Sequence, residues 1–119
     1  MPVFAWIFGV LLAAASTAFL GGCQRHASPP DPHAEAKELF DSVCGKCHGS
    51  DGRGGVPAAE GLPAPSNFQD PAFQASRSDA DLKQVIKAGK GPMPAFGSLL
   101  DEQQLTLLVS RIRGFNPKK

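Results

Sequence analysis

The chain has 119 residues, enough for one domain, and its 12 Lys and Arg against 11 Asp and Glu leave it close to neutral. It contains no run of basic residues, so nucleic acid is not expected to be a partner. Every charged side chain lies after Cys23, which leaves a body of roughly 95 residues, a size at which the hydrophobic core is small.

Residues 1–22 are apolar and uncharged, and they end in Leu20-Gly21-Gly22-Cys23. This ending resembles the lipobox of bacterial lipoproteins, in which a branched apolar residue and two small residues precede the cysteine that receives the lipid. Three interpretations stay open: a lipoprotein signal with Cys23 lipidated, an uncleaved membrane anchor, or the cleaved signal of a soluble periplasmic product. A Lys or Arg near the start, usual in signal peptides, is missing. All three interpretations predict an exported body, and the lipoprotein interpretation places it on the periplasmic side of a bacterial membrane.

Residues 23–33 are rich in Pro and small polar residues and predict a flexible tether, followed by a domain over 34–119. Asp31 and Pro32 are typical of a helix start, as N-cap and first helical residue. Apolar residues then recur at helical spacing and predict one buried face, formed by Ala36, Leu39, Phe40 and Val43.

Residues 49–77 are dense in Gly and Pro and predict a long irregular segment, with one turn near 70–75. A loop of this length in a small domain needs something to pack on, such as a buried ligand.

Two further helices follow. Ser78 with Asp81 predicts a capped helix start, and Gly89 its end. Asp101 with Gln104 predicts a second capping box, opening a helix to about Arg113. No segment alternates as a half-buried strand does, so the predicted class is all-α, with three main helices and long loops.

Cys44-Gly45-Lys46-Cys47-His48 carries the sharpest chemical signal. Two thiols three residues apart can each bond a haem vinyl group, and the adjacent histidine then reaches the iron. This pattern predicts one covalent haem c, with Cys44 and Cys47 as thioethers and His48 as an iron ligand.

Other interpretations of the two cysteines are a thioredoxin-like redox pair, a structural zinc site and a simple disulfide. A thioredoxin-like pair sits at a helix N-terminus after a strand, whereas this pair follows a predicted helix. A zinc site needs four ligands, and no second cysteine pair follows.

Met93 is the only methionine after Met1, and Pro92 and Pro94 restrict its backbone on both sides. With a haem motif present, this setting predicts Met93 as the second axial ligand of the iron. His26 and His33 are rival ligands, but both lie in or beside the tether.

The order of blocks in the body resembles a class I (cytochrome c-like) mono-haem c-type cytochrome over about residues 34–115. The blocks are AKELFDSVCGKCHGSDGRGG, SNFQDPAF, DLKQVIKAGKGPMPAF and LDEQQLTLLVSRIRGF. The resemblance implies that the first and last helices cross beside the haem and that the Met93 loop covers its other face. It implies Cys44 and Cys47 as the attachment residues, His48 as the proximal ligand and Met93 as the distal ligand.

The sequence departs from this family at three places. Ala36 stands where a glycine is usual at the helix crossing, and Arg111 stands where an aromatic residue is usual, which leaves Phe40 without that partner. The proline that orients the proximal histidine is Pro63 or Pro65.

The expected function is one-electron transfer, as a membrane-tethered periplasmic carrier or as the electron-transfer subunit of a respiratory complex, rather than as an enzyme in its own right. The alternative is a haem enzyme or a gas or redox sensor in which Met93 is labile. Redox proteins are the expected partners, and five cations are candidates for docking an acidic partner: Lys46, Arg53, Lys83, Lys87 and Lys90.

Overall fold

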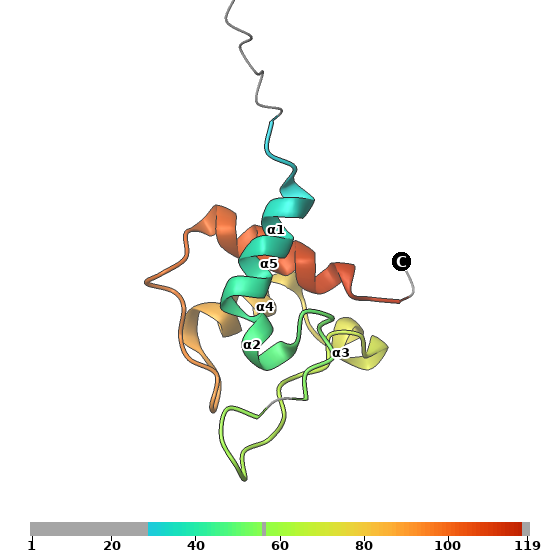
Figure 1. The fold of residues 1–119 in the computed structure, drawn as a ribbon, viewed down its shortest axis with the longest axis vertical. Coiled ribbons are helices and arrows are strands. Elements are labelled where there is room, and N and C mark those ends of the chain that lie inside the picture. Colours follow the sequence, from blue (N-terminus) through green and yellow to red (C-terminus); the bar gives the residue numbers. More distant parts are fainter. Residues whose placement is uncertain (1–28, 56, 118–119) are drawn as a thin grey trace, which may run out of the picture.

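The computed structural model describes residues 29–55 and 57–117, so the leader, Cys23 and most of the tether lie outside the described residues. The described chain contains five helices and no strand (Figure 1). They are α1 (Pro32–Val43), α2 (Gly45–His48), α3 (Pro71–Ala75), α4 (Asp79–Ala88) and α5 (Glu102–Gly114). The predicted all-α class is confirmed.

The predicted helix starts are confirmed by their caps. The Asp31 carboxylate accepts the His33 N–H at 2.9 Å, and Pro32 occupies the first turn of α1. Ser78 and Asp81 form the capping box of α4, and Asp101 and Gln104 form that of α5.

The core lies where α1 crosses α5, with α4 packed against α5 from behind (Figure 1). Phe40, Leu105 and Leu108 are fully buried, and each such side chain contributes roughly 1.5–3 kcal/mol by leaving water. Ala36, the small residue expected at the crossing, is 3% exposed.

The expectation that Phe40 lacks an aromatic partner is wrong. The Phe115 ring, one turn after Arg111, lies 5.1 Å from the Phe40 ring between centroids, and the Phe68 ring lies 6.1 Å away. The Arg111 guanidinium stacks over Phe115 at 4.2 Å. Arg111 therefore covers an aromatic cluster instead of belonging to it.

The irregular segment between α2 and α4 returns to α2. Gly54 N–H donates to the His48 carbonyl at 2.7 Å, and Phe68 N–H donates to the Gly52 carbonyl at 2.7 Å. Gly52 has φ +71°, and a Cβ there would lie 2.7 Å from the Phe115 ring. Glycine at 52 thus lets the loop pass directly over the aromatic cluster.

Within residues 29–55 and 57–117, no helix is long and apolar enough to span a bilayer.

Candidate functional site

Two thiols and an imidazole are held together by one short helix. Cys44 follows the end of α1, and the four residues of α2 carry Cys47 and His48. The Cys44 carbonyl accepts the His48 N–H at 3.0 Å, and this hydrogen bond closes one helical turn between the two residues. Cys44 and His48 are each 9% exposed, so two of the three predicted attachment and ligand residues reach the interior.

His48 is fixed in orientation by a backbone carbonyl. Its Nδ1 lies 3.2 Å from the Ser66 oxygen, and a carbonyl only accepts, so Nδ1 carries the proton. The carbonyl belongs to Ser66, next to Pro65, and neither Pro63 nor Pro65 supplies it as expected. Burial lowers the pKa of His48 from its ordinary value, although the Ser66 bond acts in the opposite direction. A neutral ring with Nδ1 protonated presents the lone pair of Nε2 to a metal.

The His48 ring also packs face to face with Phe68. The two ring centroids are 4.5 Å apart and the planes differ by 18°. Phe68 is 6% exposed, so the imidazole is supported by a buried aromatic ring as well as by the Ser66 carbonyl.

The electrostatics of the cysteines disfavour a thioredoxin-like pair. Burial, and then the neighbouring Cys47, raises the pKa of Cys44 to about 11. A catalytic dithiol needs a lowered pKa, because the thiolate is the nucleophile. No disulfide joins Cys44 and Cys47, and the described residues contain no group of three or more His, Cys, Asp or Glu placed to hold a metal ion.

Met93 lies in a tight loop after α4. Backbone bonds of 3.1 Å run both ways between Lys90 and Met93 and close a turn. Gly89 has φ +74°, and a Cβ there would lie 2.6 Å from the Met93 carbonyl oxygen. The side chain of Met93 is half-buried and packs on the same core cluster that contains Cys44.

The loop is tied to α4 beyond Met93 as well. Phe96 N–H donates to the Ile86 carbonyl at 3.0 Å, and Gly97 N–H donates to the Lys87 carbonyl at 3.1 Å. The backbone on both sides of Met93 is therefore anchored to the end of one helix.

These residues fit a covalent haem. Two reduced thiols stand at the required spacing beside a neutral imidazole whose Nε2 is free of the proton, and a thioether from another element reaches the same apolar cluster. His33, the rival ligand in the described chain, is exposed on the first turn of α1. His26 and Cys23 lie outside the described residues.

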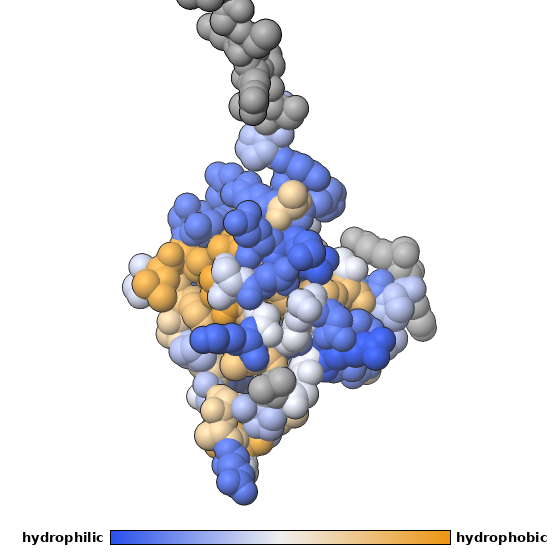
Figure 2. Space-filling model, viewed as in Figure 1, coloured by the Kyte–Doolittle hydropathy of each residue, from blue (hydrophilic) through white to orange (hydrophobic). Residues whose placement is uncertain are grey.

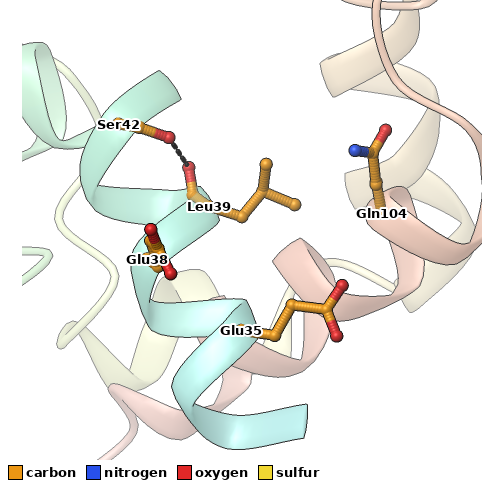
Figure 3. A pocket seen from close by; sticks show the side chains of 5 residues that line it. All are labelled: Glu35, Glu38, Leu39, Ser42 and Gln104. Carbon is orange, nitrogen blue, oxygen red and sulfur yellow. Dashed lines mark hydrogen bonds between the residues drawn. The ribbon is translucent and has the colours of Figure 1, made fainter. Parts of the chain in front are cut away.

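A separate hollow of about 290 Å³ lies beside α1 and the start of α5 (Figure 3). Its lining is formed by Glu35, Glu38, Leu39, Ser42 and Gln104. Ser42 donates to the Leu39 carbonyl, and Gln104 is engaged in the α5 capping box. None of the predicted haem residues lines this hollow, so it is distinct from the candidate site.

Apolar surface gathers on the side formed by the loop before α5, where Leu99 is 73% exposed (Figure 2). Three of the five predicted docking cations have acidic partners within the chain. Lys83 and Lys87 contact Glu102 at 3.6 Å and 2.8 Å, and Arg53 contacts Asp51 at 3.5 Å. Lys46 and Lys90 are exposed. Part of the positive charge predicted for docking is thus balanced locally.

Sequence reasoning missed the supports of His48, which are Ser66, Phe68 and the buried Gln74 behind them. Ser66 and Phe68 lie 18 and 20 residues after His48 in an irregular segment, where no periodicity shows which residue turns inward. The available signal was Phe68 itself, one of the few large apolar residues in this segment.

Comparison with known proteins places this geometry among c-type cytochromes. Residues 31–110 match the family described as cytochrome c oxidase, cbb3-type, subunit III. The chain is 31% identical to the cbb3-type cytochrome c oxidase subunit FixP of Rhizobium etli, over 96% of this chain and 39% of the relative. It therefore spans about two-fifths of that protein's length.

Two further proteins are similar over most of their own length. The cytochrome c subunit of 4-cresol dehydrogenase [hydroxylating] from Pseudomonas putida is 31% identical over 83% of this chain and 67% of the subunit. The solved structure of the KustC0563 c-type cytochrome superposes with a TM-score of 0.59 at 31% identity, covering 68% of this chain and 96% of that one.

Proposed function

Since the chain belongs to the cbb3-type cytochrome c oxidase subunit III family and carries the covalent haem c of c-type cytochromes, we propose that it transfers single electrons through this haem, whose iron His48 and Met93 would hold as axial ligands. Cys44 and Cys47 form the thioethers in this proposal. The observation that carries it is the His48 imidazole, which is buried, neutral and held through Nδ1 by Ser66. When bound, the haem supplies one-electron redox chemistry.

The protein's own residues orient the His48 imidazole and exclude water from it. The Ser66 carbonyl fixes the tautomer and the direction of His48, and a hydrogen bond of this kind raises the basicity of the metal-binding nitrogen. Phe68 covers one face of the imidazole and keeps water from it.

Met93 closes the site to substrates. A thioether at the second axial position stabilises the reduced state relative to a second nitrogen ligand. Gly89 and the Lys90 turn hold the loop in one conformation, which supports a stable rather than a labile ligand. No bond of a substrate is made or broken at such a site, so the domain serves as a carrier rather than as an enzyme.

The ligand assignment is tested by changing Met93 to histidine. Met93→His should lower the midpoint potential of the haem, because nitrogen replaces sulfur on the iron. Leu99→His, an exposed position of the same loop, is the matched control and should leave the potential unchanged. A Met93→His protein with the wild-type potential would exclude Met93 as a ligand.

We further propose that redox proteins on the periplasmic side of a bacterial membrane are the partners, and that a lipid on Cys23 keeps the domain there. The relatives are subunits of a cytochrome oxidase and of a dehydrogenase, and Leu20-Gly21-Gly22-Cys23 has the composition of a lipobox. Tethering raises the effective concentration of a carrier near membrane-bound enzymes.

The anchor is tested by Cys23→Ser. The variant should appear in the soluble fraction without the mass of the lipid. The wild-type protein should stay in the membrane fraction with the lipid attached. A Cys23→Ser protein that stays in the membrane fraction would argue for an uncleaved N-terminal anchor.

A further inference from the structure

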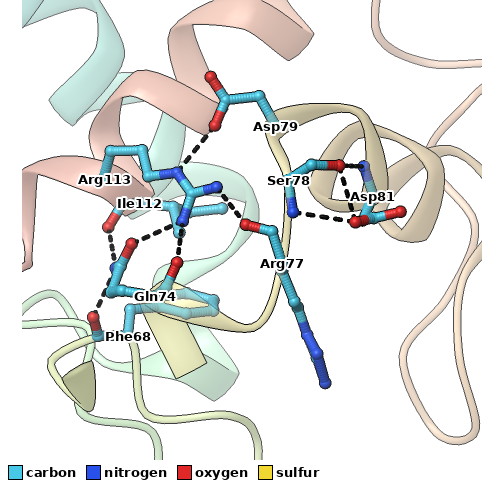
Figure 4. A network of polar contacts seen from close by, with 8 residues as sticks. All are labelled: Phe68, Gln74, Arg77, Ser78, Asp79, Asp81, Ile112 and Arg113. Carbon is cyan, nitrogen blue, oxygen red and sulfur yellow. Dashed lines mark hydrogen bonds and ion pairs between the residues drawn. The ribbon is translucent and has the colours of Figure 1, made fainter. Parts of the chain in front are cut away.

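Gln74 is a buried amide that the proposed function does not use. It is 7% exposed and lies on α3, away from both cysteines in sequence. Its Nε2 donates to the Phe68 carbonyl at 2.7 Å and to the Ile112 carbonyl at 2.8 Å (Figure 4). Both partners are acceptors only, so the amide nitrogen must face them. Gln74 thereby ties the loop at Phe68 to the last turn of α5.

Arg113 holds this amide from the other side. Its Nη1 donates to Oε1 and to the backbone oxygen of Gln74, each at 2.9 Å. Its Nη2 donates to the Arg77 carbonyl, and its Nε contacts the Asp79 carboxylate at 2.8 Å (Figure 4). The guanidinium thus fixes Gln74 in one orientation.

Phe68 connects this network to the candidate iron ligand. Its N–H donates to the Gly52 carbonyl in the loop after α2, and its carbonyl accepts from Gln74. With both backbone polar groups bonded, the Phe68 ring stays against the His48 imidazole at 4.5 Å. Ser66, whose carbonyl accepts the hydrogen bond from the His48 Nδ1–H, is two residues away on the same stretch of backbone.

We propose that Gln74, oriented by Arg113, is a positioning residue for His48 and sets the reduction potential through Phe68. The inference rests on the proposed ligation of the haem by His48. Loss of the Gln74 donors leaves the Phe68 carbonyl without its partner in the interior, and the Ile112 carbonyl keeps only the Phe115 N–H at 3.3 Å. The Phe68 stretch then loosens, the imidazole loses its fixed orientation, and water reaches the proximal side. Water stabilises the more highly charged ferric state, so the midpoint potential falls.

The test is Gln74→Leu, which removes both donors without adding a charge or a metal-binding atom. Its matched control is Gln103→Leu, the same change at an exposed position on α5. Asp31→Ala serves as a second control, because it removes the cap of α1, and the hydrogen bonds of Asp31 run to His33 and Glu35 rather than to Arg113, Gln74 or Phe68. If Gln74→Leu does not accumulate, Arg113→Lys replaces it, since lysine keeps the charge beside Asp79 but cannot reproduce the guanidinium fork.

Two measurements are made on the haem-loaded proteins. One is the midpoint potential, and the other is the pattern of paramagnetically shifted haem methyl signals in the NMR spectrum of the oxidised protein, which depends on the orientation of the axial imidazole. We expect Gln74→Leu (or Arg113→Lys) to lower the potential and to change the methyl pattern, while Gln103→Leu and Asp31→Ala leave both as in the wild type.

Two results would overturn the inference in distinguishable ways. A Gln74→Leu protein that loses stability but keeps the wild-type potential and methyl pattern gives Gln74 a structural role only. A wild-type protein whose spectrum lacks a histidine-ligated haem overturns the proposed function, and the inference with it.

Discussion

At the scale of single residues, the site depends on backbone groups that hold its side chains. His48 is directed by the Ser66 carbonyl, and Met93 is directed by a turn that closes on Lys90. Neither support depends on the identity of the supporting side chain. This explains why sequence reasoning could propose His48 and Met93 as ligands but left the residue that orients His48 open between Pro63 and Pro65, whereas the carbonyl is that of Ser66.

Gly89→Ala is expected to disturb the Met93 loop. A Cβ at 89 would lie 2.6 Å from the Met93 carbonyl, and the φ of +74° is itself unfavourable for alanine. We expect a loss of about 1–3 kcal/mol in the free energy of unfolding and a weakened near-infrared band of methionine–iron(III) ligation.

Gly91→Ala is the matched control. Gly91 has φ +56° in the same loop, but a Cβ there meets nothing within 4 Å. Gly91→Ala should lose stability because alanine is unfavourable at this positive φ, but it should leave the near-infrared band unchanged. Equal spectra for the two variants would show that the contact at Gly89 does not place Met93.

At the scale of elements, the helix boundaries were predictable because their caps are local. Asp31, Ser78 and Asp101 each accept a backbone N–H two or three residues later, within their own stretch of sequence. The short helix α2 was not predicted as a separate element, since four residues carry no periodicity. The contact of Arg111 with the Ser50 carbonyl could not be predicted, because it joins segments far apart in the chain.

Ser78→Ala should cost about 1 kcal/mol of stability at neutral pH through loss of the α4 cap, as measured by urea unfolding. Ser98→Ala, at an exposed loop position, is the control and should change little.

The Ser78–Asp81 cap also makes the stability of the fold depend on pH. Hydrogen bonds from the Ser78 hydroxyl and N–H hold the pKa of Asp81 below its ordinary value. The ionised Asp81 carboxylate therefore contributes its full stabilisation above the pKa that Asp81 has in the unfolded state. This stabilisation is lost as the pH falls through the lower pKa that Asp81 has in the folded state. Between neutral pH and the acidic range, Ser78→Ala should lose less stability than the wild type. An identical loss in both proteins would contradict this role of the Ser78–Asp81 pair.

At the scale of the whole molecule, the long irregular segment is anchored to the helix that carries His48. The long segment between α2 and α4 has only five residues of helix, yet it bonds back to α2 at the backbone and at the ring of His48. The length of this segment in a small domain predicted that it packs on something, such as a buried ligand, but not which of its residues turn back to α2.

Cys44→Ala together with Cys47→Ala should remove covalent haem and lower the melting temperature. Each kcal/mol lost corresponds to a fall of roughly 4–8 °C for a domain of this size. Haem staining of a denaturing gel checks attachment, and circular dichroism checks melting. Cys23→Ala is the control, because it removes a cysteine that lies outside the predicted haem site. A double variant that melts with the wild type would mean that the haem contributes nothing to the fold.

The most direct test of electron transfer through a closed iron is the optical spectrum of the purified wild-type protein, oxidised and reduced, with and without carbon monoxide. With His48 and Met93 both bound, the oxidised protein shows the near-infrared band of methionine–iron(III) ligation, and carbon monoxide leaves the reduced spectrum unchanged. A missing band together with ready binding of carbon monoxide would contradict the account and would favour a sensor or an enzyme with a labile Met93.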